Sequence, residues 1–223
     1  LKYAVLNGSS WDKVTVRDAE DPDDMKFGYD VSLDIDGQGY PHIAYSMISN
    51  AQHQVGGVYG EDYIRYCWKS ESGWRDWPVA KVTRRMNYTA IALTSNDMPR
   101  ILYIDPVSTN LMLASYDGIL LSHELVAAPE PGYKFGLFDI LIDEEDHMHA
   151  WYSLQDGPDY YGYHDGTNWQ FQAVGGHIRQ MALNSRGQPC LLFYDGDIIK
   201  YAVLESAGWR IDIDDVGGGE EET

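Results

Sequence analysis

Hydrophobic and polar residues alternate with a period of two along short segments of this chain. The alternation is clear in Pro41–Tyr45 and again in Ile198–Ala202. A period of two places successive side chains on opposite faces of a β-strand. No longer stretch has the spacing of an amphipathic helix. The pattern therefore predicts an all-β protein.

One block of four short strands recurs along the chain. An apolar strand is followed by a Gly-rich or acidic turn, a strand ending in Tyr, a Tyr-rich strand, and a tight turn before a Trp that opens the last strand. A period of about 40–48 residues with four strands is typical of β-propeller blades. Full copies are expected at 29–82, 88–126, 138–174 and 178–215, after a half-copy at 1–16.

The repeats predict a single five-bladed β-propeller domain over residues 1–216, built from four-stranded antiparallel blades. Residues 217–223 read as an acidic, Gly-rich tail. The first blade is incomplete, since the half-copy supplies only its two outer strands. Two explanations are open: the natural chain has about 20 further residues before Leu1, or a partner chain fills the gap.

The charge narrows the possible functions. The chain has 35 acidic and 16 Lys or Arg residues, a net charge of −19. Nucleic acid and anionic lipid surfaces are excluded as partners, because both require a cationic face. No apolar run has the length of a membrane span. A glycan or a protein remains as the ligand, and an extracellular or cell-surface location is favoured.

No cofactor or metal is expected from the motifs. Nucleotide-binding glycine patterns are absent, and Cys67 and Cys190 have no close cysteine neighbour. The histidines lack the spacing of a zinc protease. Asp34–Gly37 and Asp143–Asp146 read as hairpin turns, since the other ligands of a calcium loop are missing.

The turn before each repeated Trp carries a family resemblance. The four segments are Asn7–Trp11, Ser70–Trp74, Asp165–Trp169 and Glu205–Trp209. They resemble a degenerate Asp-box, the turn between the third and fourth strands of sialidase-like propellers. DIDGQGYPHIAY and LKYA look like bacterial repeats of that group. The resemblance implies a propeller whose Trp turns are structural. It leaves function open among sialidases, lyases, lectins and interaction modules.

Cations are expected on one face of the propeller. The connections between successive blades and between the second and third strands share the face that usually binds ligand. Lys26, Arg85, Lys134 and Arg179 come one per blade, just before the innermost strand. In an acidic protein such cations focus an anionic ligand, and Arg binds a carboxylate with two hydrogen bonds. The alternative is that they offset local acids.

A tyrosine ends the second strand in three copies, and in the fourth copy it lies one place later. Tyr45, Tyr103, Tyr152 and Tyr194 offer a stacking surface and a hydroxyl group, which suit a sugar ring. The alternative is packing between blades. His53 lies in an insertion at 47–62 that breaks the repeat, and such loops are usually functional or disordered.

Catalysis remains open. Asp30 and Asp139 occupy equivalent positions at the start of innermost strands, where a pair could act as general acid and base. Each could instead accept backbone hydrogen bonds. His177 with Arg179 and a strand-end Tyr would suit a lyase-like site. A sialidase is disfavoured, because only Arg85 and Arg179 could serve in its arginine set.

The sequence therefore predicts a non-enzymatic, lectin-like carbohydrate-binding module with its ligand at the cationic, Tyr-lined face. A protein-interaction scaffold and a glycan-cleaving enzyme, either hydrolase or lyase, are the alternatives.

Overall fold

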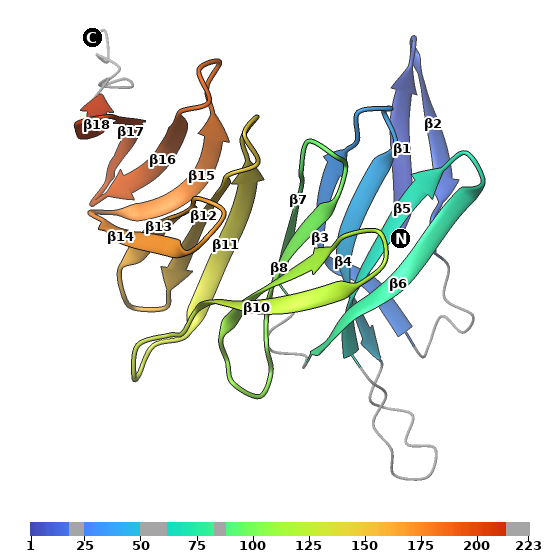
Figure 1. The fold of residues 1–223 in the computed structure, drawn as a ribbon, viewed down its shortest axis with the longest axis horizontal. Helices are drawn as coiled ribbons and strands as arrows, with labels where there is room; N and C mark the ends of the chain where they lie inside the picture. Colours follow the sequence, from blue (N-terminus) through green and yellow to red (C-terminus); the bar gives the residue numbers. More distant parts are fainter. Residues whose placement is uncertain (18–24, 50–61, 83–87, 213–223) are drawn as a thin grey trace, which may run out of the picture. The chain divides into compact units, whose positions relative to one another are not determined.

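The computed structural model describes residues 1–17, 25–49, 62–82 and 88–212. These residues form β-strands arranged in five antiparallel sheets, one of two strands and four of four strands (Figure 1). No helix able to span a membrane occurs among the described residues. The predictions of an all-β fold, of five blades and of a two-stranded first blade are confirmed.

The sheets are named blades 1 to 5 in chain order. Blade 1 comprises β1 (Lys2–Asn7) and β2 (Ser10–Thr15). Blade 2 comprises β3 (Met25–Ile35), β4 (Pro41–Ser49), β5 (Asp62–Ser70) and β6 (Gly73–Val82). Blade 3 comprises β7 (Thr89–Leu93), β8 (Pro99–Ile104), β9 (Leu111–Tyr116) and β10 (Leu121–Ala127). Blade 4 comprises β11 (Phe135–Ile142), β12 (Met148–Leu154), β13 (Asp159–His164) and β14 (Trp169–Val174). Blade 5 comprises β15 (His177–Leu183), β16 (Pro189–Asp195), β17 (Ile198–Glu205) and β18 (Gly208–Asp212).

The chain divides into two compact units. Leu1–Ala128 contains blades 1 to 3, and Pro129–Thr223 contains blades 4 and 5. That residues 1–216 form one domain stays a prediction, and the predicted tail at 217–223 lies outside the described residues.

The turn between the first and second strands is built alike in the complete blades. Its first residue places a side-chain oxygen over the turn, where that oxygen accepts backbone N–H groups. In blades 2, 4 and 5 the acceptor is Oδ1 of Asp36, Asp143 and Asn184, and the donors lie two and four residues later. In blade 3, Oγ1 of Thr94 accepts from the Met98 amide. Both acidic segments predicted as hairpin turns are therefore turns.

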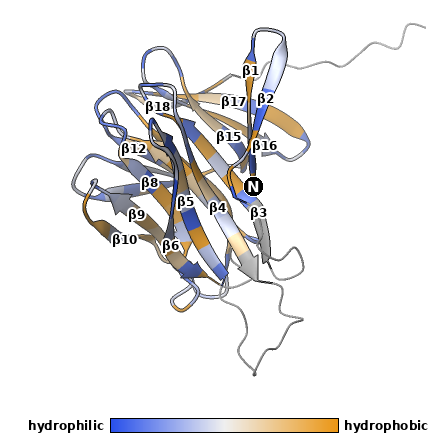
Figure 2. Ribbon diagram, turned by 90° about the vertical axis from the view of Figure 1, so that its right-hand side faces the viewer, coloured by the Kyte–Doolittle hydropathy of each residue, from blue (hydrophilic) through white to orange (hydrophobic). Residues whose placement is uncertain are grey.

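The core lies between neighbouring sheets. In the first unit, Ile64 and Tyr66 of blade 2 pack in one cluster with Ile91 and Ile101 of blade 3. In the second unit, blades 4 and 5 share a cluster of the same kind. Hydrophobic and hydrophilic residues are interspersed along strands such as β5 (Figure 2), where buried and partly buried residues alternate from Asp62 to Arg65.

Tryptophan marks two of these blade junctions. The Trp74 ring lies edge-on to Tyr3 of blade 1, with ring centroids 5.9 Å apart, and Trp209 lies edge-on to Tyr161 of blade 4 at 5.1 Å. Trp11 differs, because 61% of it is exposed. The Trp positions that the repeat predicts are thus structural at these two junctions.

Candidate functional site

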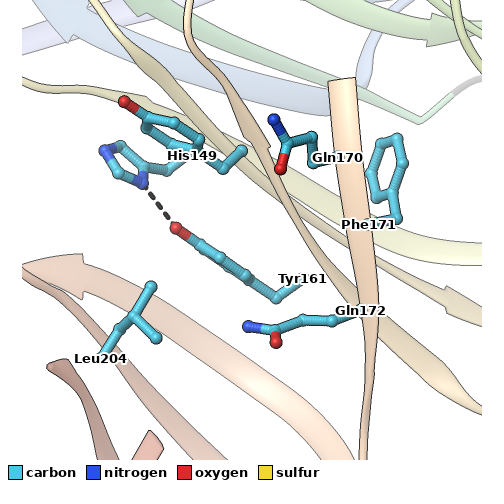
Figure 3. A pocket seen from close by; sticks show the side chains of 7 residues that line it. His149, Tyr161, Gln170, Phe171, Gln172 and Leu204 are labelled. Carbon is cyan, nitrogen blue, oxygen red and sulfur yellow. Dashed lines mark hydrogen bonds between the residues drawn. The ribbon is translucent and has the colours of Figure 1, made fainter. Parts of the chain in front are cut away.

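A cavity of about 410 Å³ lies between blades 4 and 5 (Figure 3). Its lining residues come from β12, β13, β14 and β17: His149, Tyr161, Tyr163, Gln170, Phe171, Gln172 and Leu204. We call it the blade 4–5 pocket. Its volume falls in the usual range for small-ligand sites, about 300–1,000 Å³.

Strand register explains why these side chains meet. His149 is paired with Tyr163, which is paired with Gln170. Two residues along, Trp151, Tyr161 and Gln172 form a second row. Paired residues on adjacent strands point to the same face of a sheet. Both rows therefore project from one face of blade 4.

The pocket has a buried floor and an accessible rim. His149 and Tyr161 are buried, whereas Gln170 and Gln172 are exposed. The Phe171 ring lies on the other side of β14 from the two amides (Figure 3). An aromatic floor with amide groups at the rim combines an apolar surface with groups that both donate and accept hydrogen bonds.

A hydrogen-bonded chain supports the floor. Nε2 of His149 lies 3.3 Å from Oδ2 of Asp143, and Nδ1 of His149 lies 2.8 Å from the Tyr161 hydroxyl. A carboxylate only accepts, so Nε2 carries the proton and the Tyr161 hydroxyl donates to Nδ1. Burial lowers the pKa of His149 and raises that of Tyr161. Both groups are therefore neutral near pH 7.

The same chain recurs in blade 2. Nδ1 of His42 lies 2.6 Å from the Tyr66 hydroxyl, and Nε2 lies 3.4 Å from Oδ2 of Asp36. A second cavity, of about 430 Å³, lies against it, and Trp68 and Asp97 are among its lining residues. Blade 5 keeps a reduced version, in which the Tyr201 hydroxyl lies 3.0 Å from Sγ of Cys190.

A third cavity, of about 510 Å³, involves one predicted residue. Tyr103 lines it together with Asp105, Lys81 and His123. The Tyr103 hydroxyl lies 3.0 Å from Nδ1 of His123, and burial raises the pKa of Tyr103 to about 12. This cavity lies at the ends of β6 and β8, on the side of the connection between the second and third strands.

Three of the predicted residues come together in blade 5. His177 is paired with Tyr194, and the guanidinium of Arg179 lies over the Tyr194 ring, 5.4 Å from its centroid. Nδ1 of His177 lies 3.6 Å from Oδ1 of Asp159, whose pKa is raised by burial. His177 and Arg179 are exposed, so this cluster presents both groups to solvent.

Two other predicted tyrosines are largely enclosed by protein. Tyr45 is fully buried, and its hydroxyl donates to Oδ1 of Asp76. Tyr152 is 6% exposed and packs against Phe135 and Phe171. Burial raises the pKa of Tyr152 to about 12. The packing role weighed for these residues matches these contacts.

The two predicted aspartates each accept a backbone hydrogen bond. Oδ2 of Asp30 lies 2.5 Å from the amide of Thr89, on the innermost strand of blade 3. Burial raises the pKa of Asp30, which this hydrogen bond partly offsets. Oδ1 of Asp139 accepts from the Ile140 amide. Both contacts are of the backbone-capping kind, and the two residues belong to different units.

Of the remaining predicted cations, the structure describes the side chain of Lys134. Lys134 is exposed, and its carbonyl accepts a hydrogen bond from the Gln155 amide. Lys26 lies on β3, and its side chain is outside the described residues, as are Arg85 and His53.

Sequence reasoning missed the blade 4–5 pocket. It lies at the end of the blades that carries the first-to-second and third-to-fourth strand turns, opposite the end where ligand was expected. Its signal is visible in retrospect as alternate residues on three strands: His149 and Trp151, Tyr161 and Tyr163, Gln170 and Gln172. Only the strand register shows that these pairs share a face.

Comparison with known proteins bears on the fold. No protein-family model matches the chain, and a comparison with curated protein sequences found no match. The Aleuria aurantia lectin, described as a six-bladed β-propeller, aligns with a TM-score of 0.60 and 11% identity over 94% of this chain and 68% of the lectin. A Hadza microbial sialidase aligns with a TM-score of 0.60 and 13% identity, over 89% of this chain and 48% of the sialidase. A protein of unknown function from Dyadobacter fermentans aligns with a TM-score of 0.58 and 13% identity, over 95% of this chain and 71% of that protein.

At such low sequence identity, structural similarity is evidence for a shared fold and not for a shared function. The neighbours include a lectin and a sialidase, so one fold carries different functions among them. Together with the strand order, these comparisons make the chain an all-β propeller fold of five blades.

Proposed function

We propose that the chain is a non-enzymatic glycan-binding module and that the blade 4–5 pocket holds a sugar ring. The lining of that pocket carries the proposal. Above the buried floor, the partly exposed ring of Tyr163 offers a surface for the C–H face of a pyranose. Gln170 and Gln172 supply donors and acceptors for hydroxyl groups.

The charge of the lining favours a neutral sugar. No Lys, Arg, Asp or Glu is among its seven residues, and His149 is neutral near pH 7 because burial lowers its pKa. The Aleuria aurantia lectin has a fucose recognition mode, and a mutant of it was solved with Fucα1-6GlcNAc. A neutral hexose or deoxyhexose is accordingly the ligand that we expect.

The cationic, Tyr-lined face remains a second proposed location. Arg179 over Tyr194, with His177 alongside, supports a carboxylated sugar there. Kinship to the degenerate Asp-box propellers also remains a proposal.

One experiment tests both locations. A glycan array on the wild-type chain is followed by calorimetry on each hit. The variants are the double variant Gln170→Ala/Gln172→Ala, Arg179→Ala, and Gln180→Ala, an exposed glutamine outside the pocket. We expect the double variant to bind a neutral sugar at least ~30-fold more weakly, as loss of two hydrogen bonds implies. The other two variants should match wild type.

Other outcomes separate the alternatives. Weaker glycan binding by Arg179→Ala alone would indicate that the ligand binds at the cationic face. A folded wild type that binds no glycan would overturn the proposal. Release of product from a bound glycan would favour the glycan-cleaving enzyme.

A second candidate function rests on blade 1. Leu6 and Trp11 are 55% and 61% exposed, yet their counterparts Leu204 and Trp209 pack towards blade 4. This apolar pair supports a protein contact, such as a partner chain that completes blade 1. Light scattering on wild type and Leu6→Ser/Trp11→Ser would test it: association by wild type alone supports the contact, and two monomers argue against it.

A further inference from the structure

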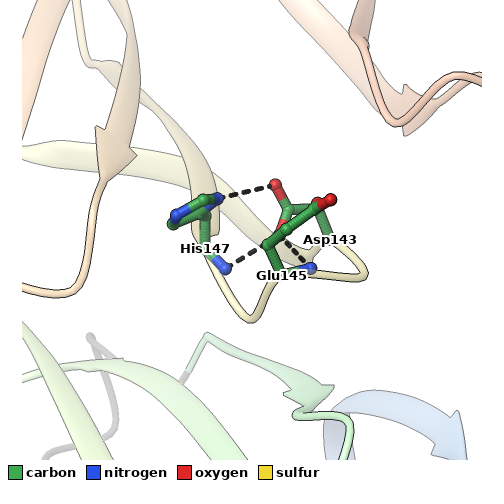
Figure 4. A group of neighbouring side chains, drawn as sticks. All are labelled: Asp143, Glu145 and His147. Carbon is green, nitrogen blue, oxygen red and sulfur yellow. Dashed lines mark hydrogen bonds and ion pairs between the residues drawn. The ribbon is translucent and has the colours of Figure 1, made fainter.

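The turn between β11 and β12 gathers three groups that can ligate a metal ion. Asp143, Glu145 and His147 each offer one ligand atom, and these atoms lie within 4.8 Å of one another (Figure 4). The set mixes an imidazole with two carboxylates. Sequence analysis interpreted Asp143–Asp146 as a hairpin turn and predicted no metal.

One pair of atoms already has the separation that a bound ion requires. Nδ1 of His147 lies 3.2 Å from Oδ2 of Asp143. Two ligands at about 2.0–2.2 Å from zinc, with an angle between about 90° and 109°, lie roughly 2.9–3.5 Å apart. An ion can therefore replace the proton between these two atoms without movement of the backbone. Glu145 is exposed, and its side chain can turn to supply the third ligand.

The neighbouring repeats indicate which of these residues the turn itself needs. Its first position must supply an oxygen acceptor, as Asp36 does in blade 2 and Asn184 in blade 5. The positions of Glu145 and His147 contribute backbone N–H groups to that acceptor. Blade 2 has Gln38 and Tyr40 there, blade 3 has Asn96 and Met98, and blade 5 has Arg186 and Gln188. The side chains of Glu145 and His147 are therefore not required for folding of the turn.

Hydrogen bonds hold the Asp143 carboxylate in one orientation. Its Oδ1 accepts the Glu145 and His147 amides, and its Oδ2 also lies 3.3 Å from Nε2 of His149. Metal-binding carboxylates are commonly oriented by such surrounding hydrogen bonds. The orientation leaves Oδ2 directed at Nδ1 of His147 (Figure 4).

We propose that Asp143, Glu145 and His147 bind a divalent first-row transition-metal ion of the zinc type, with water completing its coordination. An imidazole ligand selects such ions over calcium and magnesium, which prefer oxygen ligands. The His147 ring also contacts Tyr163, with centroids 5.5 Å apart, so the ion lies next to the blade 4–5 pocket. The inference holds whether or not that pocket binds a sugar.

The test is a zinc titration of the full chain by calorimetry. The matched variant is Glu145→Gln/His147→Tyr, which gives this turn the residues that blade 2 carries at Gln38 and Tyr40. We expect wild type to bind one high-affinity zinc ion and the variant to bind it at least tenfold more weakly, with an unchanged circular dichroism spectrum. Millimolar calcium should not displace the ion.

A second measurement does not depend on the variant. Substoichiometric Mn²⁺ added to wild type should broaden the NMR signals of residues 143–149 before those of the blade 2 turn at 36–42. Equal zinc affinity in the two proteins, no saturable binding by wild type, or broadening centred elsewhere would overturn the site. Displacement by calcium would overturn the assignment to a transition metal.

Discussion

The hydroxyl of Tyr161 donates a hydrogen bond to Nδ1 of His149 across 2.8 Å in the floor of the blade 4–5 pocket. Tyr66 and His42 repeat this relationship in blade 2 at 2.6 Å. Each imidazole is held between a phenol and a carboxylate, so its tautomer and its orientation are fixed. These hydrogen bonds fix two of the side chains in the floor of the pocket.

Tyr161→Phe should destabilise the protein. The change keeps the ring but leaves Nδ1 of His149 buried without its donor, which costs about 1–3 kcal/mol. Urea unfolding of wild type and variant measures the loss. Tyr66→Phe should give a loss of similar size in blade 2. If both variants unfold at the wild-type urea concentration, the hydrogen-bonded chain contributes nothing to stability.

Gly162→Ala should deform the wall behind the pocket. A Cβ at Gly162 would clash with the ring of Phe171, so that ring must move. We expect a loss of about 1–3 kcal/mol in unfolding free energy and weaker glycan binding. Gly175→Ala is the matched control, because a Cβ there meets no atom within 4 Å. Equal thermal melting of the two variants would contradict this account.

Asp30→Ala should reduce stability without affecting any ligand. The carboxylate accepts the Thr89 amide, and its removal leaves a part-buried donor unpaired, at a cost of about 1–3 kcal/mol. Ser32→Ala, which removes the acceptor for the Ile91 amide, should cost less. Urea unfolding and glycan calorimetry on the same samples check both statements. Normal stability combined with lost turnover of a glycan would instead support Asp30 as a catalytic acid or base.

The contribution of His42 to stability should fall as the pH is lowered below about 6.5. Burial lowers the pKa of His42, although Asp36, Asp34 and Asp97 partly counter this, and Tyr66 donates to its ring. The unfolded chain, with its ordinary His pKa near 6.5, therefore takes up the proton first. The contribution of His42 is present above about pH 6.5 and is lost as the pH falls towards the folded pKa.

The variant His42→Gln isolates that contribution. The difference in unfolding free energy between wild type and variant should shrink as the pH falls through this window. Measuring the difference cancels the pH dependence of the other groups, among them Asp30 and Asp159, whose raised pKa values act in the opposite direction. A difference that is constant with pH would show that His42 titrates alike in both states.

The architecture was predictable because short local sequence patterns specify its strands and turns, and these patterns recur along the chain. Alternating residues define each strand, and residues such as Asp36 and Asp143 define each turn. The recurrence of one block fixes four strands to a sheet. Both cysteines are buried, as expected for small apolar side chains.

The site was less predictable because it depends on which strands pair and which faces meet. Tyr152 lies near the end of β12, whereas Tyr45 lies in the middle of β4, and both rings pack inside the protein. His177, Arg179 and Tyr194 do come together, since register pairs two of them directly. The rows that build the blade 4–5 pocket join residues from three strands, and periodicity within one strand cannot reveal that.

The contact between β3 and β7 has a consequence for association between chains. Asp30, Ser32 and Asp34 accept hydrogen bonds from the amides of Thr89, Ile91 and Leu93, so these three N–H donors on one edge of β7 are occupied by side chains rather than by a neighbouring strand. A bare edge on a short apolar strand is a template for pairing with a foreign strand. Here an incoming strand would find the donors of β7 already occupied, and two carboxylates would repel its carbonyl oxygens. We therefore expect this edge of β7 to resist the addition of a foreign strand, and hence amyloid-like growth, although no strand pairs with it among the described residues.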